Sequence, residues 1–183
     1  MVSLSEGGED AVTVREFDLR TRQFVDGGFV LPTGKPRLAW EDTATLLVAR
    51  EWAPGELTAS GYPFIVKRLP RGQAPSDARE IFRGDAKDGG YGVSPFTVGD
   101  ANGHRIIMID RPISTFESEK YIVRTNDVAR TSLPLKSGVT GMLNGRAIVL
   151  LSEPWANIRS GSLAAFESAD AERDPSQLAP TPI

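Results

Sequence analysis

Short apolar runs separated by turn residues dominate the chain, and helical periodicity is nearly absent. The runs are rich in Val, Ile, Leu, Phe and Thr and end at Gly, Pro, Asp or Asn, so the pattern predicts about fourteen strands and an all-β fold. The predicted strands are Val2–Leu4, Val12–Phe17, Gly28–Leu31, Arg37–Trp40, Thr45–Ala49, Phe64–Arg68, Glu80–Phe82, Gly92–Val98, Arg105–Ile109, Lys120–Arg124, Ala129–Leu133, Ser137–Leu143, Arg146–Leu151 and Ser162–Phe166.

The strands also recur in a fixed order. The most apolar runs begin at Val2, Thr45, Arg105 and Ala147, and each is followed by a strand that ends in polar or charged residues. Roughly four strands per period of about 40 to 60 residues is typical of propeller blades, in which the apolar runs would be the inner strands. A β-sandwich has similar turn spacing but gives no reason for this repeated order. We therefore predict a β-propeller, with a sandwich as the alternative.

The last residues differ from the rest in composition. Residues 168–183 turn acidic and then proline-rich. We expect the propeller to occupy residues 1–167 and the final segment to be a frayed tail or the start of a next blade.

Composition and charge exclude several classes of function. The chain has 183 residues, a formal net charge of −3 and 21 scattered Lys and Arg residues, which argues against a nucleic-acid surface. It has no cysteine and one histidine, which excludes disulfides and histidine clusters for metals. No apolar run is long enough to span a bilayer, and the first residues do not resemble a signal peptide. We expect a soluble cytoplasmic protein that binds neither nucleic acid nor membranes.

Candidate catalytic chemistry is weak throughout. A serine hydrolase needs a nucleophile on a strained turn together with a histidine and a carboxylate, and no serine here has a G-x-S-x-G surround. His104 follows Asn-Gly and is expected to be the first residue of a strand. Paired carboxylates lie in predicted turns, where they cap the backbone. We assign no catalytic, cofactor-binding or metal-binding residue.

One long connection is a candidate contact surface. Residues 51–63, "EWAPGELTASGYP", are too many for a tight hairpin and include aromatic and hydroxyl side chains. Loops of this length often bind partners or substrates. The candidate contact residues are Trp52, Thr58, Tyr62 and Phe64.

Several of these stretches resemble a known family. The segments "GGEDA", "VREFDL", "FVDGGFVLP" and "PGELTASGYPFIVKRLPRG" occur in the order found in the propeller of bacterial prolyl oligopeptidases, and "LPLKSGVTGMLNGRAIVLLSEPW" extends the match. The resemblance is weaker from Glu80 to Asn126. It also departs from the family at Phe64, where an Arg is usual. It covers propeller alone, about three to three and a half four-stranded blades.

The resemblance implies a serine peptidase of two parts. In that family an α/β-hydrolase domain carries the Ser-Asp-His machinery, and the propeller limits entry to short peptides cleaved after proline. No residue here corresponds to that machinery, so the segment is expected to be an inactive gating lid. Its implied partners are the hydrolase domain of a parent protein and short peptides.

Two other hypotheses stay open. The chain could be a free-standing interaction module that forms a homodimer through open blade faces, or an unrelated small β-rich enzyme or carbohydrate binder. Leaving ~500 Å² of apolar area bare on one blade face costs about 12 kcal/mol at ~25 cal/mol/Å². That is comparable to the whole stability of a domain, ~5–15 kcal/mol, so an uncovered face favours self-association.

Overall fold

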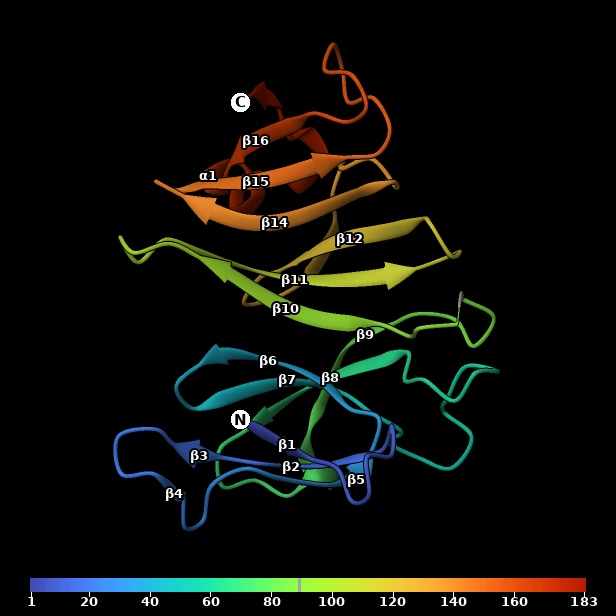
Figure 1. Cartoon of the computed structure of the whole chain (residues 1–183), viewed down its shortest axis with the longest axis vertical. Helices are drawn as coiled ribbons and strands as arrows, with labels where there is room; N and C mark the ends of the chain where they lie inside the picture. The colour runs from blue at the N-terminus through green and yellow to red at the C-terminus, as the bar shows by residue number, and fades with distance from the viewer. Residues whose placement is uncertain (89) are drawn as a thin grey trace.

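A stack of four antiparallel sheets makes up the chain, which the computed structural model describes at residues 1–88 and 90–183 (Figure 1). The first sheet comprises β1 (Val2–Leu4), β2 (Val12–Arg15) and β5 (Val30–Gly34), and a small ribbon beside it comprises β3 (Phe17–Asp18) and β4 (Gln23–Phe24). The second comprises β6 (Arg37–Asp42), β7 (Thr45–Ala49), β8 (Ile65–Pro70) and β9 (Arg79–Arg83). The third comprises β10 (Ser94–Gly99), β11 (Arg105–Pro112), β12 (Ser118–Val123) and β13 (Val128–Arg130). The fourth comprises β14 (Ser137–Leu143), β15 (Arg146–Leu151), β16 (Leu163–Glu167) and β17 (Thr181–Pro182).

Each of the last three sheets is a meander in which consecutive strands are neighbours. Neighbouring sheets meet through their first strands, because β10 contacts β6 on one side and β14 on the other. Consecutive four-stranded meanders that face one another in this way are the blades of a β-propeller. The prediction of an all-β partial propeller is confirmed, with three four-stranded blades and one three-stranded sheet among the described residues.

The apolar runs were predicted to be the inner strands of the blades, but the strands through which neighbouring blades meet are the first ones, β6, β10 and β14. The runs that start at Thr45, Arg105 and Ala147 form β7, β11 and β15, the second strand of each blade. In β7, Leu46 and Val48 pack toward the first sheet, whereas Leu47 belongs to the cluster shared with the third sheet. Because both faces of a central blade are covered, both alternating sets of side chains are buried, and the run is apolar throughout.

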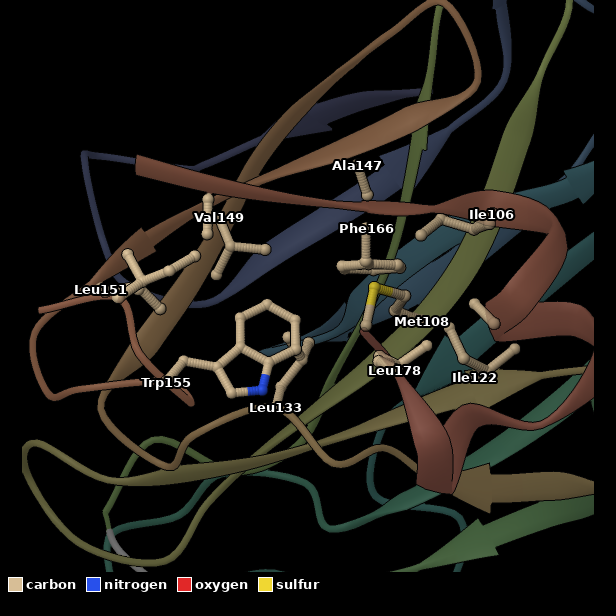
Figure 2. Packing of buried hydrophobic residues seen from close by; sticks show 13 residues of the cluster. Ile106, Met108, Ile122, Leu133, Ala147, Val149, Leu151, Trp155, Phe166 and Leu178 are labelled. Carbon is tan, nitrogen blue, oxygen red and sulfur yellow. The ribbon is translucent and has the colours of Figure 1, made fainter. Parts of the chain in front are cut away.

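The core consists of three apolar clusters, one between each pair of adjacent sheets. The cluster between the third and fourth sheets contains Phe166, which is 1% exposed. Figure 2 shows Met108 against the ring of Phe166, with Trp155 on the side of Leu151. The Trp155 and Phe166 rings meet edge to face, with centroids 6.3 Å apart. Trp155 is therefore a buried core residue.

Residues 168–183 are folded into the fourth sheet and differ from the expected tail. They form α1 (Ser168–Arg173), a 3-10 turn at Pro175–Gln177 and β17, which pairs with β16. Ala171 and Leu178 are buried in the cluster between the third and fourth sheets. The segment supplies the last strand of an existing blade and covers one side of its core.

Candidate functional site

The predicted contact loop is anchored to the second blade by its own buried residues. Thr58 is 5% exposed, and its hydroxyl accepts a hydrogen bond from the Tyr62 N–H at 3.2 Å. Phe64 is also buried. The indole N–H of Trp52 donates to the Ile65 carbonyl at 3.2 Å, which fixes the ring against the sheet. Thr58 and Phe64 therefore hold the loop in place, and their side chains are not available at its surface.

Tyr62 connects this loop to the first sheet. Its hydroxyl donates to Asp10 at 3.3 Å, and the Lys35 ammonium lies 4.7 Å from its ring centroid. Lys35 also pairs with Asp10 at 2.7 Å, and this hydrogen bond lowers the pKa of the Asp10 carboxyl. The ring of Tyr91, which is 58% exposed, lies 6.4 Å from that of Tyr62. Tyr62 and Tyr91 thus bring aromatic side chains to the surface at this end, and contact with a partner stays a prediction.

The hairpin turns at the opposite end of the blades carry the histidine. His104 Nδ1 lies 3.0 Å from the Asp100 carboxylate. Within residues 1–88 and 90–183, the His104 side chain makes hydrogen bonds with Asp100 alone, so no hydroxyl nucleophile is aligned with it. Asp100 also accepts hydrogen bonds from the backbone N–H groups of Asn102, His104 and Gly145. The pair therefore organises two turns and lacks the third member of a hydrolytic triad.

A cavity of about 890 Å³ opens between the first strands of the second and third blades. Leu38, Trp40 and Phe96 give it an apolar wall. At its rim, Arg71 holds Glu16 through two hydrogen bonds of 2.6 and 2.8 Å. These bonds lower the pKa of Glu16 and raise that of Arg71. Glu16 and Arg71 thus neutralise each other, and the cavity offers shape and apolar area for binding.

A polar network missed by the sequence analysis joins the second blade to the third. Arg68 contacts both carboxylate oxygens of Glu41, at 2.8 and 2.7 Å, and donates to the carbonyls of Arg124 and Thr125. The partners lie 27 to 57 residues away in the sequence. The only local signal is the basic stretch "KRLPRG" at Lys67–Gly72, and a cluster of basic residues does not indicate which distant groups they contact.

Comparison with known proteins fits this architecture. No family model matches the chain. It is 36% identical over 190 residues to an uncharacterized peptidase of Sinorhizobium fredii and 27% identical over 197 residues to an uncharacterized peptidase of Rickettsia prowazekii. These alignments cover 98% and 97% of this chain and 26% and 27% of the relatives. The chain thus spans about a quarter of the length of the curated relatives it matches.

Two solved structures also match nearly the whole of this chain. A post-proline cleaving enzyme from Rickettsia typhi superposes with a TM-score of 0.83 at 25% identity, over 98% of this chain and 28% of that one. A structure from a study of two prolyl endopeptidases superposes with a TM-score of 0.63 at 15% identity, over 98% of this chain and 25% of that one, and it supports the fold alone.

The stacked meanders define the chain as part of a β-propeller. It is homologous to a propeller segment of the prolyl oligopeptidase family of peptidases. No helix in the described part of the chain is long and apolar enough to cross a membrane.

Proposed function

We propose that this segment is the gating propeller of a prolyl oligopeptidase-like serine peptidase that cleaves short peptides after proline. The observation that carries the proposal is the superposition of 98% of the chain on a post-proline cleaving enzyme with a TM-score of 0.83. In this role the segment packs against an α/β-hydrolase domain, restricts entry to short peptides and does no catalysis itself. We place the protein in the cytoplasm, where short peptides arise as degradation products.

The buried framework supports a role in gating. Three apolar clusters and the Arg68–Glu41 network hold the blades in fixed relation, as a rigid rim requires. Tyr62 and Tyr91 of the loop-bearing end supply accessible rings of the kind enriched at protein interfaces. We propose that this end faces the hydrolase domain.

A segment exchange tests the proposal directly. The matching quarter of the Sinorhizobium fredii peptidase is replaced by this chain, and hydrolysis of a short proline-containing peptide and of an unfolded protein is measured. We expect the hybrid to cleave the short peptide after proline and to leave the long chain intact. Two results would contradict the gating role. One is a folded hybrid that cleaves the short peptide and the unfolded protein equally well. The other is a hybrid that cleaves neither substrate although its serine still reacts with a phosphonate.

Two controls use this chain by itself. A serine-directed phosphonate is expected to leave it unlabelled, and stoichiometric labelling would mean that the segment carries its own nucleophile. An immunoblot of source cells is expected to show a polypeptide several times larger than 19.8 kDa. A band at 19.8 kDa would instead favour a free-standing interaction module.

The exposed face of the fourth sheet supports this second candidate. Leu143, Leu150 and Leu163 are 63%, 45% and 42% exposed there. Exposed apolar patches on a sheet face mark surfaces that another protein surface covers. In this alternative, two copies of the chain associate through that face.

A further inference from the structure

Lys120 is a buried charged side chain that neither the fold nor the proposed peptidase role accounts for. It is 3% exposed and lies on β12, directly across from Asp110 on β11, which in turn pairs with Ser94 on β10. Met108 and Ile122, two positions away along these strands, belong to the cluster between the third and fourth sheets. The row Ser94–Asp110–Lys120 therefore faces the fourth sheet as well.

Only part of the hydrogen-bonding capacity of this row is used. The Lys120 ammonium donates to the carbonyls of Ser118 and Leu135, each at 2.9 Å, which leaves one of its three N–H groups. The Asp110 carboxylate makes no hydrogen bond or ion pair with the residues that the structure describes, Lys120 included. The ammonium of Lys120 and the carboxylate of Asp110 thus belong to directly paired residues of neighbouring strands but form no ion pair.

A cavity of about 330 Å³ lies beside both charges, between the third and fourth blades. Ser94, Ser118 and Ser137 line it, together with Phe96 and Val139. It also reaches Gly138 on β14. Its volume is at the small end of the range for ligand pockets, ~300–1,000 Å³. The pocket suits a molecule of a few polar groups with one small apolar part.

Burial makes an occupant with opposite charges favourable. Taking an ammonium out of water is costly, and here burial lowers the pKa of Lys120 although Asp110 and Glu153 raise it in part. A carboxylate placed at the remaining N–H offsets that cost through a charge-assisted hydrogen bond. An ammonium on the same molecule would do the same for Asp110. A ligand that carries only a negative charge would pair with Lys120 but be repelled by Asp110. A ligand that carries only a positive charge would pair with Asp110 but be repelled by Lys120.

We infer that this pocket binds a small zwitterion, an amino acid or a dipeptide, with its carboxylate on Lys120 and its amino group on Asp110. Phe96 and Val139 would contact the side chain of the ligand. The inference is independent of the peptidase proposal, because the pocket is complete within this chain and its occupancy requires no hydrolysis.

Calorimetric titration of the chain with alanylproline tests the inference, with acetate and ethylamine as ligands that carry only one of the two charges. We expect saturable 1:1 binding of the dipeptide and binding at least about tenfold weaker for either half. Saturable binding that acetate alone reproduces overturns the zwitterion assignment. No saturable binding of the dipeptide overturns the site itself, since the cavity then holds water only.

Substitutions locate the binding. Lys120→Met and Asp110→Asn are each expected to weaken dipeptide affinity at least about tenfold, whereas Lys87→Met, which removes a charge from an exposed loop, leaves it unchanged. Near-UV circular dichroism checks that each variant is folded. If Lys120→Met does not fold, Asp110→Asn decides the question, because that side chain makes no hydrogen bond or ion pair with the described chain. Unchanged affinity in folded Asp110→Asn overturns the inference.

Discussion

The Asp100 carboxylate accepts a hydrogen bond of 2.7 Å from the backbone N–H of Gly145, and this bond joins the first hairpin turns of two neighbouring blades. The Asp100 side chain is 3% exposed although it lies in a turn. Asn144 and Gly145 have φ values of 49° and 78°, as in tight hairpins in which both central residues are left-handed. The Asn144–Gly145 turn is therefore held by its own geometry and by a carboxylate from the adjacent blade.

Removing this carboxylate should loosen the contact between the third and fourth blades. In Asp100→Ala, the N–H groups of Gly145 and Asn102 lose their acceptor, so we expect the thermal midpoint of the chain to fall by several degrees. Asp26→Ala serves as the control, because Asp26 is an exposed turn residue and its loss should leave the midpoint nearly unchanged. Equal midpoints for the two variants would contradict this account.

The same contact predicts a dependence on pH. Burial raises the pKa of Asp100, but hydrogen bonds from Gly145, His104 and Asn102 lower it by more, so the pKa lies below its usual value. A carboxyl whose folded-state pKa is depressed stabilises the protein above its unfolded pKa and stops doing so as the pH falls through its folded pKa. The difference in midpoint between the parent chain and Asp100→Asn should therefore be full near neutrality and shrink in acid. A difference in midpoint that grows as the pH falls would contradict a lowered pKa of Asp100 in the folded protein.

The fold could be predicted because strands and turns are local signals. Val2–Leu4, Thr45–Ala49, Ser137–Leu143 and Arg146–Leu151 have the predicted bounds, since apolar runs closed by turn residues define them. Val12–Phe17 was predicted as one strand, but the chain breaks at Glu16. There the carboxylate accepts from the Phe29 N–H and pairs with Arg71, and no local pattern encodes these partners.

The cluster between the third and fourth blades should dominate the stability of that half. Phe166→Ala removes a ring that is 1% exposed, and we expect it to lower the free energy of unfolding by about 3–5 kcal/mol. Phe116→Ala makes the same chemical change at a ring that is 81% exposed and should have an effect near zero. Urea unfolding followed by tryptophan fluorescence measures both. A similar loss in the two variants would mean that the cluster is not packed as described.

The final segment should behave as part of the core. Leu178 is 6% exposed, and its N–H donates to the Ser132 hydroxyl at 3.0 Å. Leu178→Ala is expected to lower the free energy of unfolding by about 2–5 kcal/mol, whereas Ile183→Ala, at a side chain that is 65% exposed, should be neutral. Urea unfolding is again the measurement, and a neutral Leu178→Ala would restore the expectation of a frayed tail.

The candidate site was harder to predict than the fold. The length of the 51–63 connection indicated a contact loop, yet Thr58 and Phe64 are buried and Tyr91, outside the loop, shares the accessible surface with Tyr62. The burial of Lys120 was also missed, because a lysine in a strand is ordinarily expected to point toward solvent. Burial of a charge depends on distant partners, here the Leu135 carbonyl in the connection to the neighbouring blade, 15 residues away.

The open face of the fourth sheet bears apolar side chains that a second copy of the chain could cover. Leu150 lies opposite Leu163 across the β15–β16 pair and opposite Gly138 across the β14–β15 pair, so a smooth apolar strip crosses the sheet. If a second copy covers this strip, the mass of the chain in multi-angle light scattering should rise with concentration. Leu150→Lys should abolish that rise, because a lysine ammonium in a covered sheet face is desolvated without a partner. Leu19→Lys, at a turn residue that is 83% exposed, should leave it unchanged. A parent chain that stays monomeric at micromolar concentration shows that this face needs no second copy, and the self-associating module then loses its main support.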